Sequence, residues 1–440
     1  MNQIITDVQS SETTHADAPR QASKPFAGRC RLCGGRLEKT FVNLGMSPLC
    51  ESFLTSAQLD ASEAFYPLHA LVCDSCFLVQ LKEYVQPGHI FTEYAYFSSY
   101  STSWVDHARR YCEMIQRRLN LGTNSRVYEI ASNDGYLLQH FLPMNVPVVG
   151  IEPAANVAEV AKRKNIPTLV EFFGLELAQT LVSEGKPAHL IIGNNVLAQV
   201  PDLNDFTAGM AHLLAPTGVI TLEFPHLERL IIENQFDTIY HEHFSYFSLV
   251  TIDHLARKHG LKVFDVDQIG THGGSLRVYL CRAEATFDVS PNVGLLLAHE
   301  REIGFENIDQ YARFSNQVHQ TKRRLLSFLI DSKEKGARIC GYGAPGKGNT
   351  LLNYCGIGTD FLEFTVDRNP YKHGRYTPGM HIPIHDVSAI DEMRPDYVLI
   401  LPWNLKAEIV AQMRHIGDWG GKFIVPIPSV EIIDPRQLAA

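Results

Sequence analysis

Two pairs of cysteines constrain this chain more tightly than any other feature of its sequence. Cys30 and Cys33 form one C-x-x-C motif, and Cys73 and Cys76 form a second. Four thiolates in two such pairs can close a tetrahedral cage around zinc, which leaves no open position for chemistry and makes the metal structural. The spacer between the pairs is longer than in a compact zinc ribbon and predicts inserted strands. A redox role is the weaker alternative, because the pairs lack a thioredoxin-like pattern.

The remaining cysteines and the N-terminus bear on the cellular compartment. Residues 1–25 are polar, lack the layout of a signal peptide and are expected to form a disordered tail. A cytoplasmic, reducing location follows, which favours metal binding or burial over disulfides. The scattered cysteines receive no role; they are Cys50, Cys112, Cys281, Cys340 and Cys355.

Composition limits the classes of partner. Lys and Arg number 39 against 48 Asp and Glu, a net charge of −9, whereas nucleic-acid binding needs a basic footprint. No apolar run reaches the roughly 20 residues of a membrane span. We therefore expect neither a nucleic-acid nor a membrane partner, and no obligate protein partner is evident. At 440 residues the chain is too long for one compact core, so two or three domains are expected.

The middle of the chain has the pattern of a doubly wound α/β domain. The stretch RVYEIASNDGYLLQHF runs from a short strand through a turn at Asn133, Asp134 and Gly135 into a helix. A second strand, VPVVGIEP, ends in Glu152, where an acid binds ribose hydroxyls in such sheets. The turn lacks G-x-G-x-x-G. Its E-x-x-x-N-D-G form resembles instead the first motif of S-adenosylmethionine-dependent methyltransferases.

These strand ends together predict a site for S-adenosylmethionine. The strand in HLIIGNNVLAQVPD adds a further ligand-facing edge, and LKVFDVDQI and GSLRVYLCRA fit the closing antiparallel pair of the same fold. The structural alternative is that Asp134 caps a helix and Glu152 is a surface acid. The expected cofactor-binding residues are Glu129, Ser132, Asn133, Asp134, Gly135, Glu152, Pro153 and Asn195.

The last third of the chain carries a glycine-rich loop of its own. The glycines of GYGAPG spell G-x-G-x-x-G, and Asp367 ends the next strand as in a dinucleotide site. The same stretch nearly spells a Walker A loop, but Gly348 replaces the metal-binding hydroxyl. Both patterns share an anion site at a helix N-terminus, to which Lys347 adds charge. A turn that only packs strand against helix is the alternative.

The order of these motifs resembles one family. A four-cysteine module, an E-x-x-S-N-D-G methyltransferase domain, YHEHFSYFS and GYGAPGKGNT follow one another as in the sugar C-methyltransferases, over nearly the whole chain. These enzymes methylate carbon 3 of nucleotide-linked 4-keto-deoxysugars, using S-adenosylmethionine. The resemblance implies an α/β protein of three parts, with the active site between the last two. The parts are a zinc-binding domain at 26–86, a class I methyltransferase (Rossmann-like) domain at 87–290 and a Rossmann-like C-terminal domain at 291–440 with a sugar-nucleotide loop.

The stretch TIYHEHFSYFS contains the catalytic residues that this resemblance implies. Its second histidine, His243, corresponds to the family's base, and Tyr240 and Glu242 match active-site positions that bind the sugar or orient the base. Chemistry makes the same demand, because a proton next to a ketone needs a base of near-neutral pKa within hydrogen-bond reach. In an extended segment His241 and His243 would face one side; a loop would relax this constraint. A packed core histidine and an H-x-H metal site are the alternatives.

The remaining expected contacts concern the sugar nucleotide. The stretch YAYFSSYSTSW also matches a family segment, and DRNPYKHGRY places basic residues near the C-terminal strand ends. The family usually has histidine where this chain has Gln199, which can hydrogen-bond a sugar but cannot carry a proton. The expected substrate-binding residues are Tyr94, Tyr96, Gln199, Gly343, Lys347, Asn349, Arg368 and Arg375.

Other functions stay open at this point. Gln199 is compatible with a related S-adenosylmethionine-dependent enzyme of altered substrate or chemistry. A zinc module also accompanies RNA methyltransferases, although the acidic charge weighs against RNA. An NAD-dependent oxidoreductase would use the GYGAPG loop as its dinucleotide site. A scaffold that binds a sugar nucleotide without turnover would leave the base-bearing segment unexplained.

Overall fold

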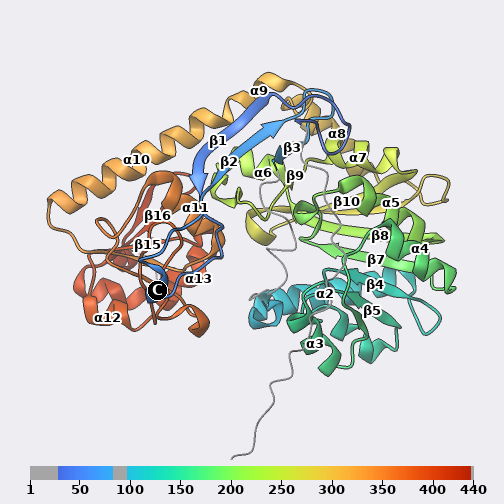
Figure 1. Cartoon of the computed structure of the whole chain (residues 1–440), viewed down its shortest axis with the longest axis horizontal. Helices are drawn as coiled ribbons and strands as arrows, with labels where there is room; N and C mark the ends of the chain where they lie inside the picture. Colours follow the sequence, from blue (N-terminus) through green and yellow to red (C-terminus); the bar gives the residue numbers. More distant parts are fainter. Residues whose placement is uncertain (1–27, 83–96, 438–440) are drawn as a thin grey trace, which may run out of the picture.

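The computed structural model describes residues 28–82 and 97–437, which form three β-sheets with helices packed around them (Figure 1). The sheets follow the order of the chain, with a small N-terminal sheet, a larger middle sheet and a C-terminal sheet. The predicted α/β class, with a cysteine-bearing N-terminal module and two sheet domains after it, is confirmed.

The N-terminal sheet is antiparallel and has the order β1-β2-β3-β9. β1 (Lys39–Ser47) and β2 (Tyr66–Val72) form a long hairpin, and β3 (Val79–Leu81) follows the second cysteine pair. The last strand, β9 (Ser245–Tyr246), comes from the middle of the chain, directly after YHEH. The expected catalytic stretch is therefore attached to the edge of the cysteine-bearing module.

The middle sheet has the order β10-β11-β8-β7-β4-β5-β6. The strands from β8 to β6 run parallel, and β11 is antiparallel to both of its neighbours. β4 lies between β5 and β7, where the strand order reverses, and ligands bind at such a switch point beyond the carboxyl ends of the strands. The strands are β4 (Val127–Ile130), β5 (Val148–Ile151), β6 (Thr168–Leu169), β7 (Ala188–Asn194), β8 (Leu214–Pro225), β10 (Leu261–Ile269) and β11 (Ser275–Arg282).

Helices of the middle domain begin at side chains that satisfy their first N–H groups. Ser101 caps α2 (Thr102–Leu119), Asp202 caps α5 (Leu203–Leu213) and Ser248 caps α7 (Leu249–Lys258), each by accepting from a backbone N–H in the first turn. The other helices of this domain are α3 (Ala155–Arg163), α4 (Leu175–Ser183) and α6 (Leu227–Ile232).

The C-terminal sheet has the order β14-β13-β12-β15-β16-β17 and is parallel except at β17. The long helix α10 (Phe314–Glu334) leads into this domain after α8 (Pro291–Glu302) and α9 (Ile308–Ala312). The glycine-rich loop lies between β12 and α11, as the sequence predicts. The elements are β12 (Ile339–Tyr342), α11 (Gly346–Cys355), β13 (Thr365–Val366), β14 (Ile384–His385), α12 (Ala389–Met393), β15 (Tyr397–Ile400), α13 (Lys406–Gln412), β16 (Lys422–Val425) and β17 (Glu431–Ile433).

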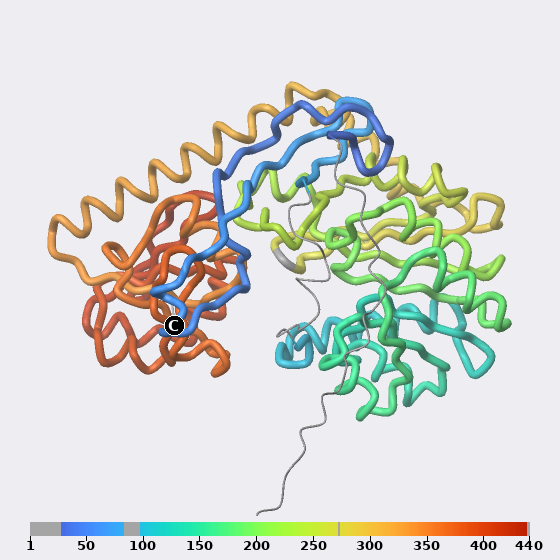
Figure 2. Tube along the Cα trace, in the orientation of Figure 1, coloured from blue at the N-terminus to red at the C-terminus, as the bar shows by residue number. Residues whose placement is uncertain are grey.

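The hairpin of β1 and β2 connects the two sheet domains, and its path is plain in the tube of Figure 2. Near the cysteines, the Asn204 side chain on α5 donates to the Arg31 carbonyl. At the far end, Leu54 and Tyr376 exchange backbone hydrogen bonds of 3.0 and 2.9 Å. Residues 48–65, here called the hairpin loop, thus lie against the C-terminal domain while the cysteine end lies against the middle domain.

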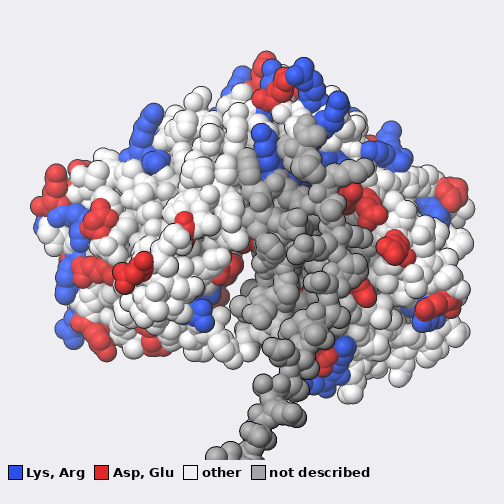
Figure 3. Space-filling model, in the orientation of Figure 1, with Lys and Arg blue, Asp and Glu red and all other residues white. Residues whose placement is uncertain are grey.

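No helix within the described part of the chain is both long and apolar enough to span a membrane. On the face drawn in Figure 3, Lys and Arg side chains are interspersed with Asp and Glu side chains around the outline. The described residues on this face form no continuous basic patch.

A buried aromatic stack joins the hairpin to the helices that lead into the C-terminal domain. The ring of Phe41 in β1 lies 4.6 Å from that of Phe314, nearly parallel, and 6.2 Å from that of Tyr311. Phe41 is fully buried in the core shared by these elements. The stack therefore holds the hairpin in place between the domains.

Phe41→Ala is expected to lower the free energy of unfolding by about 3–5 kcal/mol, because it opens a cavity in this core. Urea denaturation followed by circular dichroism measures the change. Phe172→Ala, at an exposed phenylalanine, is the matched control and should change stability by no more than about 0.5 kcal/mol. Equal denaturation midpoints for the two variants would contradict the stack's role.

Candidate active site

The four predicted zinc ligands lie together at one end of the N-terminal module. Their sulfur atoms all lie within 4.8 Å of one another, and the pairs Cys30–Cys76 and Cys33–Cys73 are each 3.5 Å apart. A tetrahedral site with zinc–sulfur bonds of about 2.3 Å separates its sulfurs by about 3.8 Å. The cluster therefore fits zinc, and residues 28–82 and 97–437 contain no second group of this kind.

The backbone around each pair supports thiolate ligands. Gly34 and Phe77 directly follow the second cysteine of each pair, and both adopt positive φ, 79° and 58°. The resulting turns point donors at the sulfurs: the Gly35 N–H lies 3.4 Å from Cys33 Sγ, and the Gln80 amide lies 3.1 Å from Cys30 Sγ. Such donors offset the negative charge that thiolates would bring to a closed metal site.

The expected S-adenosylmethionine residues gather at the switch point of the middle sheet. Glu129 lies in β4, and residues 132–135 form the turn that follows it. Glu152 directly follows β5, and its two carboxylate oxygens accept the N–H groups of Asn133 and Ala154, both at 2.9 Å. Glu152 is 5% exposed, so the surface-acid alternative is wrong.

Several polar atoms at this edge are buried and lack a hydrogen-bond partner among the described residues. They are Glu129 Oε2, Ser132 Oγ, Asp134 Oδ1, Asn194 Nδ2 and Asn195 Oδ1. Buried polar atoms without partners are costly, and a concentration of them at the carboxyl ends of the strands indicates a polar ligand. The set offers carboxylate, hydroxyl and amide groups, which suit the ribose, amino and carboxylate groups of S-adenosylmethionine.

The turn after β4 is packed too closely for larger residues. Gly135 has a φ of +76°, and a Cβ atom there would lie 2.3 Å from Ile166 Cδ1. Asp134 pairs with Lys164 at 3.3 Å. The glycine thus allows the turn to approach Ile166 and the α3 residue Ala161.

The YHEH stretch is a turn, which separates the surroundings of its two histidines. The His243 N–H donates to the Tyr240 carbonyl at 2.9 Å. His241 is buried against β2, with its ring 5.8 Å from that of Tyr66, and burial lowers its pKa. The segment is therefore not extended, and the expectation that an extended segment would place both histidines on one side does not apply.

His243 lies between two tyrosine rings. Its ring centroid is 4.1 Å from that of Tyr240 and 6.3 Å from that of Tyr246. Its Nδ1 lies 3.2 Å from the carbonyl oxygen of Thr238, within the same turn. The Phe244 N–H donates to the Ala198 carbonyl at 2.7 Å, which places the turn beside Gln199.

The C-terminal domain holds the start of this turn. The Thr350 hydroxyl on α11 lies 3.2 Å from the Ile239 carbonyl oxygen, and the Trp403 indole donates to Asp237 Oδ2 at 2.7 Å. Burial raises the pKa of Asp237 to about 7, and the nearby charge of Lys347 acts in the opposite direction. The start of the YHEH turn is therefore bound to the C-terminal domain by these two contacts.

The predicted substrate residues of the C-terminal domain fall into two groups. Lys347 and Asn349 lie on α11 beside the turn, with Lys347 Nζ 4.8 Å from the Trp403 ring. Arg368 is exposed and pairs with Glu408 at 3.0 Å, and Arg375 is also exposed. Tyr94 and Tyr96 lie outside the described residues.

The amides of the glycine-rich loop already meet carboxylates of this chain. The Ala344 N–H donates to Asp367 Oδ2 at 2.7 Å, and the Gly346 backbone makes a hydrogen bond to the Glu51 carboxyl group. Gly343 has a φ of +87°, and a Cβ atom there would lie 2.6 Å from Pro402. Gly343 therefore allows close packing in this loop, and Asp367, at the end of the next strand, accepts a hydrogen bond from the loop backbone.

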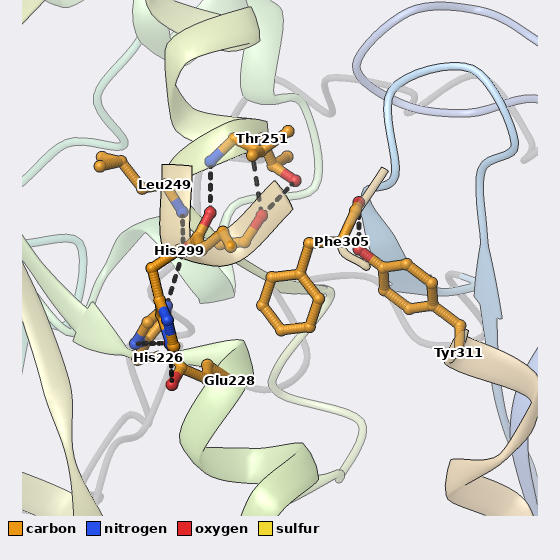
Figure 4. Close-up of polar contacts among 10 residues, drawn as sticks. His226, Glu228, Leu249, Thr251, His299, Phe305 and Tyr311 are labelled. Carbon is orange, nitrogen blue, oxygen red and sulfur yellow. Dashed lines mark hydrogen bonds and ion pairs between the residues drawn. The ribbon is translucent and has the colours of Figure 1, made fainter. Parts of the chain in front are cut away.

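A network of histidine and glutamate side chains anchors the chain on the far side of the turn. Figure 4 shows His226, Glu228 and His299 pointing toward one another below the start of α7. His226 Nε2 lies 2.7 Å from Glu300 Oε1, and Glu300 also accepts two N–H groups at the start of α7, both at 2.8 Å. α7 follows β9, so Glu300 of α8 fixes the chain just after the YHEH turn.

Comparison with known proteins decides the family. The chain is 35% identical over 408 residues to the C-methyltransferase NovU of Streptomyces niveus, covering 93% of this chain and 97% of that protein. Three family models match along it: a zinc-binding domain at 30–91, a methyltransferase domain at 103–266 and a C-methyltransferase C-terminal domain at 270–428. The chain belongs to the sugar C-methyltransferase family. It is an S-adenosylmethionine-dependent methyltransferase, as its motifs predicted.

Two solved methyltransferase structures are similar to part of this C-methyltransferase. The magnesium protoporphyrin IX methyltransferase of Synechocystis PCC 6803, solved with bound S-adenosylmethionine, is 16% identical and covers 40% of this chain and 77% of its own, with a TM-score of 0.30. The CcbJ methyltransferase of Streptomyces caelestis is 11% identical and covers 40% of this chain and 89% of its own, with a TM-score of 0.32.

Sequence reasoning missed several residues of the C-methyltransferase site. Glu223 is fully buried at the end of β8, where His107 and Arg277 bind it at 3.0 and 2.8 Å. The rule that led to Glu152, an acid at the end of a buried strand, would have found Glu223. The Asp237–Trp403 contact carries no local signal, because its residues are 166 positions apart.

Cys73→Ser is expected to abolish zinc binding by the C-methyltransferase and to lower the melting temperature of its N-terminal module, since metal binding contributes directly to folding. Metal analysis of the purified protein should find one zinc per chain in the wild type. Cys340→Ser, at a buried cysteine outside the cluster, is the control and should retain zinc. Metal-free wild-type protein, or a zinc-replete Cys73→Ser variant, would contradict the site.

Proposed function

We propose that this enzyme methylates carbon 3 of a nucleotide-linked 4-keto-deoxysugar, with His243 as the base that forms the enolate. One observation carries the proposal. His243 Nδ1 lies 3.2 Å from the Thr238 carbonyl oxygen, and a carbonyl oxygen can only accept a hydrogen bond. In the neutral ring Nδ1 therefore carries the proton and Nε2 carries the lone pair, as proton abstraction requires.

The surroundings of His243 suit this chemistry. The Tyr240 and Tyr246 rings restrict the imidazole plane, so Nε2 keeps one direction, which favours a near-attack geometry. Tyr240 and Glu242 are proposed to bind the sugar and to orient the base. Gln199, beside the turn, is proposed to hydrogen-bond the sugar without taking part in proton transfer.

The cofactor residues, which lie at the carboxyl ends of the strands, are proposed to bind S-adenosylmethionine. S-adenosylmethionine, when bound, supplies an electrophilic methyl group on a positively charged sulfonium. Glu152 accepts one backbone N–H on each oxygen, and a carboxylate has further lone pairs for the ribose hydroxyls. Glu129 is fully buried, and burial holds its pKa well above its usual range. The turn of residues 132–135, together with Pro153 and Asn195, completes the proposed cradle.

The C-terminal domain is proposed to bind the nucleotide part of the substrate. Lys347 and Asn349 lie beside the catalytic turn on α11, so they are assigned to the sugar or its nearest phosphate. Gly343 allows the glycine-rich loop to pack closely against Pro402. Arg368 and Arg375 are both exposed and are assigned to the outer phosphate or the nucleoside. Tyr94 and Tyr96 remain proposed sugar contacts.

A panel of nucleotide 4-keto-deoxysugars tests the reaction directly. Each sugar is incubated with the enzyme and S-adenosylmethionine carrying a deuterated methyl group, and products are analysed by mass spectrometry and NMR. The proposal predicts one labelled methyl group at carbon 3 of at least one sugar. Transfer to RNA in place of every sugar, or oxidation coupled to NAD without methyl transfer, would contradict it.

Glu152→Ala is expected to weaken S-adenosylhomocysteine binding by about 10- to 100-fold, because hydrogen bonds to a charged acceptor contribute about 1.5–3 kcal/mol. Isothermal titration calorimetry measures the affinity. Glu152→Gln keeps the size and one acceptor oxygen and should lose less. Glu159→Ala, at an exposed residue of α3, is the control; a loss in this variant equal to that in Glu152→Ala would refute the ribose assignment.

His243→Asn is expected to slow methyl transfer by about 100- to 10,000-fold, because asparagine keeps hydrogen bonding but cannot accept the proton. Single-turnover rapid quench measures the chemical step, and calorimetry checks that both ligands still bind. His241→Asn, whose histidine faces β2, should cost far less. The assignment fails if His241→Asn is inactive while His243→Asn transfers the methyl group normally.

A further inference from the structure

The hairpin loop of the N-terminal module places the thiol of Cys50 next to the catalytic turn. Cys50 Sγ lies 3.3 Å from Glu242 Oε2, across 192 positions of sequence. Both side chains are buried, with Cys50 3% and Glu242 7% exposed. Glu242 directly precedes His243, so the thiol bonds the residue next to the proposed base.

The C-terminal domain fixes the position of this thiol. The Asn349 side-chain amide on α11 donates to the Cys50 carbonyl oxygen. Gly346 begins α11, and a Cβ atom there would lie 2.7 Å from Cys50 Sγ. Cys50 is therefore enclosed between α11 and the catalytic turn, and its sulfur cannot move away from Glu242 without displacing one of them.

The direction of the hydrogen bond follows from the surrounding groups. Burial raises the pKa of Glu242 to about 7, with a further upward contribution from Glu51, while the Cys50 hydrogen bond lowers it. Burial and the neighbouring carboxyl groups raise the pKa of the Cys50 thiol well above its usual range. The thiol thus stays protonated and donates, and the carboxylate accepts.

Other titratable groups near Glu242 come from three elements. Glu51 adjoins Cys50 in the hairpin loop, and Lys372 of the C-terminal domain lies 3.9 Å from Glu51. Tyr246 of β9 is buried, and the negative charge of Glu242 helps to raise its pKa. The Glu242 backbone also lowers the pKa of this carboxyl group by a hydrogen bond; among the side chains of the described residues, Cys50 supplies the hydrogen bond that favours its ionised form.

We propose that Cys50 is a positioning residue that holds Glu242 as an oriented carboxylate next to the base. The proposal rests on the proposed function, because it gives Glu242 a role in that reaction. It also assigns the N-terminal module a part in catalysis: the cysteine-bearing hairpin places one of its own side chains in the active site.

The hydrogen bond itself is tested without any turnover. Difference infrared spectroscopy of the full-length protein compares wild type with Cys50→Ala to identify the Cys50 sulfur–hydrogen stretching band. The same band should shift in Glu242→Gln, because the thiol then loses its charged acceptor. An unshifted band would overturn the proposal, whatever the methyl acceptor proves to be.

The positioning role is tested through the pH profile of kcat/KM. Cys50→Ala should move the acid limb to higher pH by about one unit, because the ionised form of Glu242 loses a donor. Cys50→Ser should return the limb toward the wild-type position, since a hydroxyl is also a donor. Cys340→Ala removes the same atoms from the buried strand β12 and should leave the limb unmoved.

The two readouts separate the possible failures. An acid limb that stays in place in Cys50→Ala, or that moves equally in Cys340→Ala, would overturn the positioning role. If Cys50→Ala does not fold, Cys50→Ser supplies the reference for the infrared band, and the Glu242→Gln comparison still decides. A wild-type enzyme that methylates none of the sugars would refute the proposed function. The infrared result would still show whether Cys50 donates a hydrogen bond to Glu242.

Discussion

The hydrogen bond between His243 Nδ1 and the Thr238 carbonyl oxygen is the contact on which this account of the molecule depends. It spans 3.2 Å within one short turn and determines which ring nitrogen carries the lone pair. The bond can do so only if the carbonyl itself is held still. Trp403 binds Asp237 just before that carbonyl, and β9 pairs with β3 just after the histidine. The position of His243, the proposed base, is therefore set by all three parts of the chain.

The N-terminal module explains how separate domains maintain this geometry. Its cysteine end packs against the middle domain, and its hairpin loop pairs with the C-terminal domain through Leu54 and Tyr376. A small module has little core of its own, and a closed metal site compensates for that. The ring of Phe41 in the hairpin also stacks on Phe314 of α10, which leads into the C-terminal domain. The structural zinc is therefore proposed to act on catalysis indirectly, by fixing the hairpin that spans the domains.

Much of this arrangement was predictable, because the strongest sequence signals are local. The C-x-x-C spacing predicted the cysteine cluster that the structure shows, and the turn after the first strand of the middle domain predicted the strand ends where buried polar atoms gather. Asp367 follows a strand as a ribose-binding acid would, and it accepts the Ala344 N–H of the glycine-rich loop, much as Glu152 accepts backbone N–H groups. The contacts of Cys50 and Asp237 could not be predicted from the sequence. Each joins segments far apart in the chain, and no periodicity or motif records such a pair.

Exchange of the sugar's carbon 3 proton with solvent tests the central claim most directly. The enzyme and a substrate identified from the sugar panel are incubated in deuterated water without methyl donor, and deuterium at carbon 3 is measured by NMR. If the enolate forms reversibly and its proton exchanges, the wild type should incorporate deuterium at carbon 3 and the His243→Asn variant should not. Equal incorporation by the two proteins would show that another group removes the proton, and would contradict the assignment of His243 as the base.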